Sequence, residues 1–350
     1  STARSQATPV YHADFLGTAS QAVAVNDSGL VVGTGKVGLY PRAFVAGPGK
    51  PVTYLSMPFG LLSSGARDIN EAGVIVGVVS PYSTTNVIRY PAKWTPDGAG
   101  GYTCTVLDLL PSHNRGSADA INNLRDIIGS SSYQSDIHTV LYTPSGTVDL
   151  PGLGAYRPWS LNDQRVYVSP NAGAVRVDLD TLAVERLSFP PGFTGSDGWV
   201  INASGQVAGD LLLAGPGCTM QAALYTDGIG WETVGDCGTS NSAYDLNDAG
   251  DVLLAVGSVP YVRFAGGGMH RVEDLIVADV GHWTVYGGFD MALNNARQMA
   301  FYASNAGTGQ TGVILVTPQS DVICQADLGF GGPGAMHLSM CGGDLSSGTT

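Results

Sequence analysis

The side chains that could do chemistry in this sequence are aromatic, basic and acidic residues that recur just before short apolar segments. Histidine and tyrosine can exchange protons as acid and base, and the candidates for that role are His113, His282 and Tyr244. Aromatic rings can stack on sugar rings or cations, while Arg and Asp can fix the orientation of a ligand. The ligand-binding candidates are Arg67, Asp119, His138, Tyr156, Arg157, Trp159, Trp199, Tyr286 and Asp290.

The motifs of several common enzyme classes are absent. The sequence has no GxSxG, no HExxH and no phosphate-binding glycine loop. The segment Asp245-x-Asn247-x-x-Gly250-Asp251 matches part of a calcium loop but lacks the terminal glutamate. We therefore expect no cofactor and no metal; a structural calcium ion is conceivable there but not indicated.

Composition excludes two classes of protein. Charged residues make up 13% of the 350-residue chain, yet no apolar run of about 20 residues could span a membrane. The net charge of −13 argues against nucleic acid, which needs a basic surface. Glycine occurs 49 times, about twice the usual ~7%, and this favours many short strands joined by tight turns.

The five cysteines predict two local disulfide bonds, Cys218–Cys237 and Cys324–Cys341, with Cys104 left free in an apolar strand. Disulfide bonds are typical of oxidising compartments, so we expect an extracellular or periplasmic protein. The start, Ser1-Thr2-Ala3, is typical of a mature chain after removal of a signal peptide.

A repeat centred on asparagine organises the chain. Seven segments of the type Ala66–Gly77 (ARDINEAGVIVG) align, 40 to 52 residues apart. Their asparagines are Asn26, Asn70, Asn122, Asn162, Asn202, Asn247 and Asn294. A period of ~40–50 residues with four strands in each unit is typical of β-propellers.

Each asparagine should open a hairpin turn between two apolar strands. An aliphatic residue precedes it, polar residues follow, and its side chain can bond the backbone two residues on. The residue three positions after the asparagine should adopt a left-handed conformation, which glycine does easily. Gly29, Gly73, Gly205 and Gly250 occupy this position, and Arg125, Arg165 and Arg297 occupy it elsewhere, at ~1 kcal/mol of strain each.

We therefore predict an all-β fold, a seven-bladed β-propeller of four-stranded antiparallel blades in residues 1–318. The segment Val10–Gly17 resembles a fourth strand and should complete the last blade, which leaves no open sheet edge. Residues 319–350 are rich in glycine and should form a stapled tail or the start of a further β-module.

The two faces of such a propeller should differ. The asparagine turns and the Gly/Pro turns before the fourth strands share one face and are short. The opposite face carries the longer loops, which hold most of the candidate residues. Three residues before each asparagine stand Val23, Arg67, Asp119, Trp159, Trp199, Tyr244 and Met291. This chemical diversity is expected at the mouth of a channel, although Trp159 and Trp199 could equally pack between blades.

The repeat resembles that of bacterial extracellular HAF-repeat proteins, which are named for a His-Ala-Phe triplet. The AxDINxxGxIVG core matches, and the triplet stands here as Arg42-Ala43-Phe44. Looser forms are Pro91-Ala92-Lys93, His138-Thr139-Val140 and Gln221-Ala222-Ala223. The resemblance covers nearly the whole predicted propeller and implies secretion or surface exposure. It supplies no catalytic motif.

Three functions compete. The first is a monomeric module that binds a glycan or protein on the loop face. The second is an extracellular polysaccharide lyase or hydrolase, with Arg157 neutralising a uronate carboxylate. A retaining glycosidase fits less well, because it needs carboxyl groups ~5 Å apart and Asp119, Asp197 and Asp290 fall in separate blades. The third is a structural repeat domain of a larger surface protein.

Overall fold

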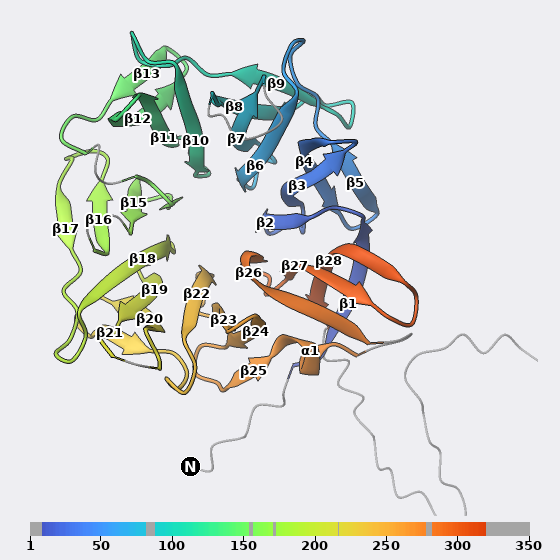
Figure 1. The fold of residues 1–350 in the computed structure, drawn as a ribbon, viewed down its shortest axis with the longest axis vertical. Helices are drawn as coiled ribbons and strands as arrows, with labels where there is room; N and C mark the ends of the chain where they lie inside the picture. Colours follow the sequence, from blue (N-terminus) through green and yellow to red (C-terminus); the bar gives the residue numbers. More distant parts are fainter. Residues whose placement is uncertain are drawn as a thin grey trace, which may run out of the picture.

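The computed structural model describes residues 9–81, 88–153, 157–170, 173–215, 217–277 and 282–319. Within these residues the strands form seven four-stranded antiparallel sheets, arranged as the blades of a β-propeller around a common central axis (Figure 1). The predicted fold class is confirmed. Among the described residues no helix is long and apolar enough to cross a lipid bilayer, and α1 (Val272–Leu275) has only four residues.

The blades follow one another along the chain. Blade 1 consists of β2 (Gln21–Val25), β3 (Val31–Val37), β4 (Tyr40–Gly47) and β5 (Lys50–Tyr54). Blade 2 consists of β6 (Ser63–Ile69), β7 (Ile75–Ser80), β8 (Tyr90–Pro96) and β9 (Tyr102–Val106). Blade 3 consists of β10 (Arg115–Ile121), β11 (Ile127–Tyr133), β12 (Asp136–Thr143) and β13 (Gly146–Asp149). Blade 4 consists of β14 (Ser160–Leu161), β15 (Val166–Ser169), β16 (Val175–Asp178) and β17 (Val184–Arg186).

The remaining three blades complete the ring. Blade 5 consists of β18 (Gly195–Ile201), β19 (Val207–Leu212), β20 (Met220–Thr226) and β21 (Gly230–Thr233). Blade 6 consists of β22 (Asn241–Leu246), β23 (Val252–Val256), β24 (Val259–Arg263) and β25 (Met269–Arg271), and α1 follows it. Blade 7 consists of β26 (Trp283–Leu293), β27 (Met299–Asn305), β28 (Gln310–Pro318) and β1 (Tyr11–Gly17).

The ring closes through the N-terminal strand, as the sequence predicts. Strand β1 pairs antiparallel with β28 and is the outermost strand of blade 7, with Tyr11 opposite Pro318. Strand β1 covers the outer edge of β28, so blade 7 has four strands like the other blades and joins the first described strand of the chain to the last. The predicted tail, with Cys324 and Cys341, lies outside the described residues.

The seven asparagine turns form a closed ring of hydrogen bonds. In each turn the side-chain Oδ1 of the asparagine accepts the N–H four residues on, at 2.8 to 3.0 Å. The Nδ2 group donates to the backbone oxygen of the asparagine in the next blade, at 2.8 to 3.3 Å, and Asn294 returns to Asn26. The asparagines are 2% to 7% exposed. The same side chain therefore both shapes its own hairpin and joins two blades.

The left-handed position of these turns is also confirmed. Arg125, Arg165 and Arg297 have φ of 70°, 61° and 60°, in the region that the four glycines occupy in the other turns. Two of these arginines gain ion pairs there: Arg165 with Asp126 at 2.5 Å, and Arg297 with the fully buried Asp251 at 2.7 Å. These contacts offset part of the cost of an unfavourable backbone angle.

The hydrophobic core lies between neighbouring blades. One cluster joins Val25 and Phe44 of blade 1 to Ala292 and Ala300 of blade 7, and a second joins blade 2 to blade 3. Small residues such as Ala292 occupy the innermost strands, where the blades converge on the central axis.

Candidate functional site

A cavity of about 1270 Å³ occupies the central channel and opens among the loops opposite the asparagine turns. All seven residues that stand three positions before an asparagine line this cavity: Val23, Arg67, Asp119, Trp159, Trp199, Tyr244 and Met291. We refer to this space as the central cavity.

A β-bulge in the innermost strand explains why this position faces the cavity. In five blades the pairing between the first two strands shifts by one residue, and Val23, Arg67, Asp119, Trp199 and Tyr244 are the extra residues. A bulged residue is left out of the ladder, and the bulge can re-aim its side chain. The position therefore varies in chemistry without changing the pairing of the blade.

Four of the five bulged blades have a glycine at the end of the repeat, packed against the innermost strand, whereas blade 6 has Leu254 there. A Cβ atom on Gly33, Gly129 or Gly209 would lie 1.9 Å from a backbone oxygen of the adjacent innermost strand, and one on Gly77 would lie 2.1 Å away. Only glycine fits beneath the bulged backbone at these positions.

In blade 7 the pairing between the first two strands has a longer interruption than a single-residue bulge. Strand β26 pairs with β27 up to Tyr286 and resumes at Met291, so four residues between them are left out of the ladder. Among them Phe289 and Asp290 line the central cavity, and Phe289 is 65% exposed. Phe289 was not among the residues predicted from sequence. The available signal was the preceding Gly287-Gly288 pair, which allows such a detour.

One wall of the cavity is aromatic. Trp159 and Trp199 meet edge to face with ring centroids 5.1 Å apart, and Phe289 contacts Trp199 at 6.3 Å and Tyr244 at 5.2 Å. The indole nitrogen of Trp199 donates to Asp210 at 2.9 Å, which fixes the ring. Trp159 remains 49% exposed, so its surface is available to a ligand.

A second wall, on the side of blades 2 to 4, carries four arginines, Arg67, Arg89, Arg115 and Arg157. Arg67 forms an ion pair with Asp119, whose side chain is 5% exposed. Burial, together with the positive charges of Arg157 and Arg89, lowers the pKa of Arg67 to about 10. These guanidinium groups therefore lie close enough to repel one another.

Three of these arginines have no carboxylate partner among the described residues. Arg115 donates to Ser132 Oγ at 3.2 Å and to the Gln134 carbonyl, which are both uncharged acceptors. Arg89 and Arg157 are exposed at the cavity rim and form no ion pair with any described residue. This wall is a positive surface in a chain whose net charge is −13.

Two aspartates in the channel serve the scaffold. Asp68 accepts the N–H groups of Ile69 and Ile121, both at 2.8 Å, and thereby joins blade 2 to blade 3. Asp245 does the same for Leu246 and Leu293, at 2.8 and 2.6 Å. Burial raises the pKa of both carboxyl groups to about 7.

The predicted catalytic residues do not come together. Tyr244 lines the cavity, and burial raises the pKa of its hydroxyl. His113 lies at blade 3 beside His138, with ring centroids 5.1 Å apart, and His282 is exposed just before β26. No described histidine lines the central cavity. Tyr286 stacks on Tyr302 outside the lining, and Tyr156 lies outside the described residues.

Of the remaining ligand-binding candidates, Arg67, Asp119, Arg157, Trp159, Trp199 and Asp290 line the cavity, and His138 does not. Burial raises the pKa of Asp290. The structure thus brings six of the nine candidates into one cavity, and their role in binding stays a prediction.

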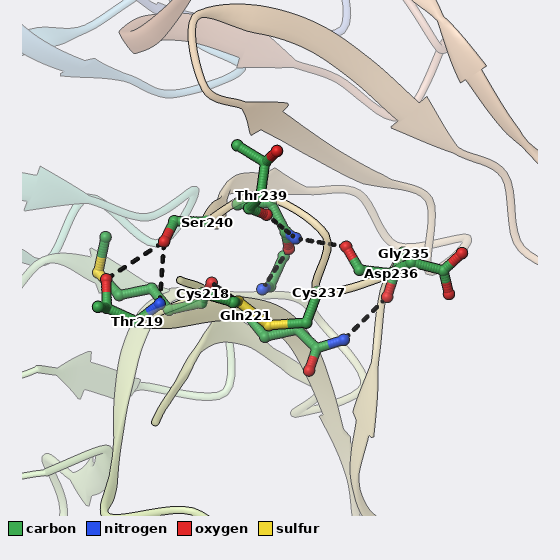
Figure 2. The surroundings of a disulfide bond; sticks show 11 residues. Cys218, Thr219, Gln221, Gly235, Asp236, Cys237, Thr239 and Ser240 are labelled. Carbon is green, nitrogen blue, oxygen red and sulfur yellow. Dashed lines mark hydrogen bonds between the residues drawn. A yellow bond between two sulfur atoms is a disulfide. The ribbon is translucent and has the colours of Figure 1, made fainter. Parts of the chain in front are cut away.

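The predicted disulfide bond Cys218–Cys237 is confirmed, with Cα atoms 5.6 Å apart (Figure 2). It joins the loop between β19 and β20 to the loop between β21 and β22, both on the cavity face. Hydrogen bonds from Gln221 to the Gly235 carbonyl, and between Thr219 and Ser240, support it (Figure 2). Cys104 lies half-buried in β9 as a free thiol, and burial raises its pKa to about 11.

The fold defines this protein as a seven-bladed β-propeller. The structure described as "YCF48 bound to D1 peptide" is similar over 90% of this chain and 98% of that chain, with a TM-score of 0.55 and 14% identity. The extracellular domain of the putative hybrid two-component system BT3049 from B. thetaiotaomicron gives a TM-score of 0.49 at 9% identity, over 87% of this chain and 42% of that one. No protein-family model and no curated protein matches the sequence.

Proposed function

We propose that the central cavity binds an acidic peptide segment that also carries an aromatic or apolar group. The observation that carries this proposal is the division of the cavity into an arginine wall and an aromatic wall. The chain has 16 Lys and Arg residues in all, and four arginines line this one space. Such a concentration indicates a ligand that carries negative charge.

The charge balance inside the cavity supports the same ligand. Four aspartates also line the cavity. Asp119 is already paired with Arg67, Asp68 and Asp245 each accept two backbone hydrogen bonds, and Asp290 has a hydrogen bond to the Gln21 side chain and a pKa raised by burial. Arg89, Arg115 and Arg157 are left to pair with carboxylates from outside, and Arg can hold a carboxylate with two parallel hydrogen bonds. The exposed faces of Trp159 and Phe289 suit a ring or an apolar side chain.

The similar propeller described as bound to a peptide favours a peptide over a glycan as the ligand class. An acidic glycan offers comparable chemistry, since its carboxylates could pair with the same arginines and its rings could stack on Trp159. The glycan therefore serves as the alternative outcome of the binding experiment.

A polysaccharide lyase or hydrolase is the weaker hypothesis. The hypothesis assigns the acid and base roles to a histidine and a tyrosine within hydrogen-bond reach of the substrate. His113 and His282 do not line the cavity, and Tyr244 stands within the aromatic wall. The cavity therefore holds groups that orient an anion but no assembled histidine–tyrosine pair among the described residues.

The binding experiment uses the full chain against arrays of acidic peptides and acidic glycans. We expect Arg157→Gln and Trp159→Ala each to weaken binding of the selected peptide about 10- to 100-fold, since a hydrogen bond to a charged group contributes ~1.5–3 kcal/mol. Arg186→Gln, on the outer strand β17, is the matched control and should leave affinity unchanged. Binding should also weaken as salt rises.

Unchanged affinity in both cavity variants would show that the ligand binds elsewhere. Binding of acidic glycans alone would refute the peptide proposal while keeping the site. Release of unsaturated sugars from a bound polymer would favour the lyase instead.

We further propose that the protein is exported and belongs with the HAF-repeat proteins. The disulfide bond supports an oxidising compartment. The triplets that carry the resemblance fall in third strands: Arg42-Ala43-Phe44 in β4, Pro91-Ala92-Lys93 in β8, His138-Thr139-Val140 in β12 and Gln221-Ala222-Ala223 in β20.

A further inference from the structure

We propose a second site, outside the central cavity: a divalent metal site of the zinc class formed by His113, Asp136 and His138 on blade 3. The ligand atoms of these three side chains lie within 4.8 Å of one another. Two imidazoles and one carboxylate are a ligand set that zinc commonly uses, with a fourth position left for water.

The distances fit a metal ion. His138 Nε2 lies 3.1 Å from one oxygen of Asp136, and His113 Nε2 lies 3.6 Å from the other. Ligands held 2.0–2.1 Å from a tetrahedral zinc ion are separated by about 3.3 Å. The two separations bracket that value, so a small movement of the exposed Asp136 side chain would complete the geometry.

Both imidazoles are oriented by a second partner. His138 Nδ1 pairs with Asp149 at 2.9 Å, and His113 Nδ1 pairs with the hydroxyl of the fully buried Ser131 at 2.9 Å. Each histidine thus has its Nδ1 atom engaged and its Nε2 atom directed at Asp136. A carboxylate or hydroxyl behind the ring, with the other nitrogen on the metal, is the usual arrangement of histidine ligands.

The scaffold holds the ligands in place before any ion binds. Asp136 and His138 are alternate residues of β12, so their side chains project from the same face of the strand. The His113 side chain is 7% exposed, and Ser131 also accepts the N–H of Leu110, which fixes the loop before β10. Asp136 is 67% exposed, so an ion can enter from solvent.

A metal here would tie the loop before β10 to the β11–β12 hairpin. Arg115 lies two residues after His113, and Ile137 lies between Asp136 and His138; both line the central cavity. The ion would therefore brace the cavity wall on blade 3 without being part of that wall.

The test is isothermal titration calorimetry. The full chain is treated with EDTA, dialysed and then titrated with Zn²⁺. We expect one equivalent to bind, with affinity lowered at least ~100-fold by His113→Ala and by His138→Ala. Asp149→Asn keeps all three ligands and should lower affinity about 10- to 100-fold. Melting of the metal-free variants checks that they fold, and Zn²⁺ should raise the melting temperature of the wild type but not that of His113→Ala or His138→Ala.

The control is His12→Ala, because His12 Nε2 lies 3.2 Å from Asp14 in β1, the same pairing of alternate residues on one strand. It should bind Zn²⁺ like the wild type. Co²⁺ in place of Zn²⁺ should give visible bands of a nitrogen and oxygen site, without sulfur-to-metal charge transfer. Zn²⁺ affinity that survives in both His113→Ala and His138→Ala, or cobalt bands that show thiolate ligation, would overturn the proposal.

Discussion

Substitution of a single ring asparagine should destabilise the whole propeller. Asn70 is 3% exposed, donates to the Asn122 carbonyl at 3.1 Å and accepts the N–H of Val74 at 2.9 Å. Asn70→Ala leaves the N–H of Val74 without a partner, at ~1–3 kcal/mol, and removes a hydrogen bond to the Asn122 carbonyl, at ~0.5–1.5 kcal/mol, although that carbonyl keeps the Arg125 N–H at 3.1 Å. We expect the free energy of unfolding to fall by about 3 kcal/mol, a large part of the stability of a typical domain.

The assay is equilibrium unfolding in urea, followed by tryptophan fluorescence. Asn70→Asp separates the two roles of the side chain, because it keeps an acceptor for Val74 but places a carboxylate against the Asn122 carbonyl. The introduced carboxyl group should therefore have a raised pKa in the folded protein, so this variant regains stability as pH falls.

Glu71→Gln, in the exposed part of the same turn, should change stability by less than ~0.5 kcal/mol. A free energy of unfolding for Asn70→Ala within ~0.5 kcal/mol of the wild-type value would refute this prediction. It is also refuted if the stability of Asn70→Asp does not respond to pH differently from that of the wild type.

Two further predictions concern the turns and the channel. Arg125→Gly should stabilise the fold by up to ~1 kcal/mol, because φ of 70° suits glycine. Arg297→Gly should destabilise it, because Asp251 loses its ion pair while fully buried. A loss of stability in both variants, measured by urea unfolding, would contradict this prediction. Burial raises the pKa of Asp68 and Asp245 from 3.8 to about 7. Between pH 4 and 7 these two groups therefore hold more protons in the folded protein than in the unfolded chain. Their contribution to the free energy of unfolding falls as pH rises through that window. Asp245→Asn should reduce this fall relative to the wild type when unfolding is measured at both ends of the window, and an unchanged difference would exclude Asp245 as its source.

The fold could be predicted from sequence because its determinants are local and repeated. Each asparagine turn is encoded within about twelve residues, so the number of turns gives the number of blades. Even Arg125, Arg165 and Arg297 could be placed in the left-handed region, because their position in the repeat matched that of a glycine. Closure by β1 followed from the same count, since the seventh copy lacked a fourth strand.

The site was harder to predict because it is built across blades. Phe289 reaches Trp199 and Tyr244 only through a four-residue detour in β26, and no repeat defines that detour. His113 and His138 are 25 positions apart in sequence and come together because the loop before β10 packs against β11. Both residues could be assigned from sequence to the face opposite the asparagine turns. The contact between their side chains could not be predicted.

Residues at the two ends of the channel differ in how much they contribute to stability and in how freely they vary between blades. On the asparagine face, each side chain bonds to the next blade, so a change at one position disturbs two blades at once. Three residues before each of these asparagines, the bulged residue is left out of the backbone pairing. Arg67, Trp199 and Tyr244 occupy this position in different blades. Because the pairing around the bulge is kept while its side chain differs, this position can change the chemistry of the cavity at little cost to the fold. The asparagines that make the propeller recognisable in sequence are therefore distinct from the variable residues that give the central cavity its chemistry.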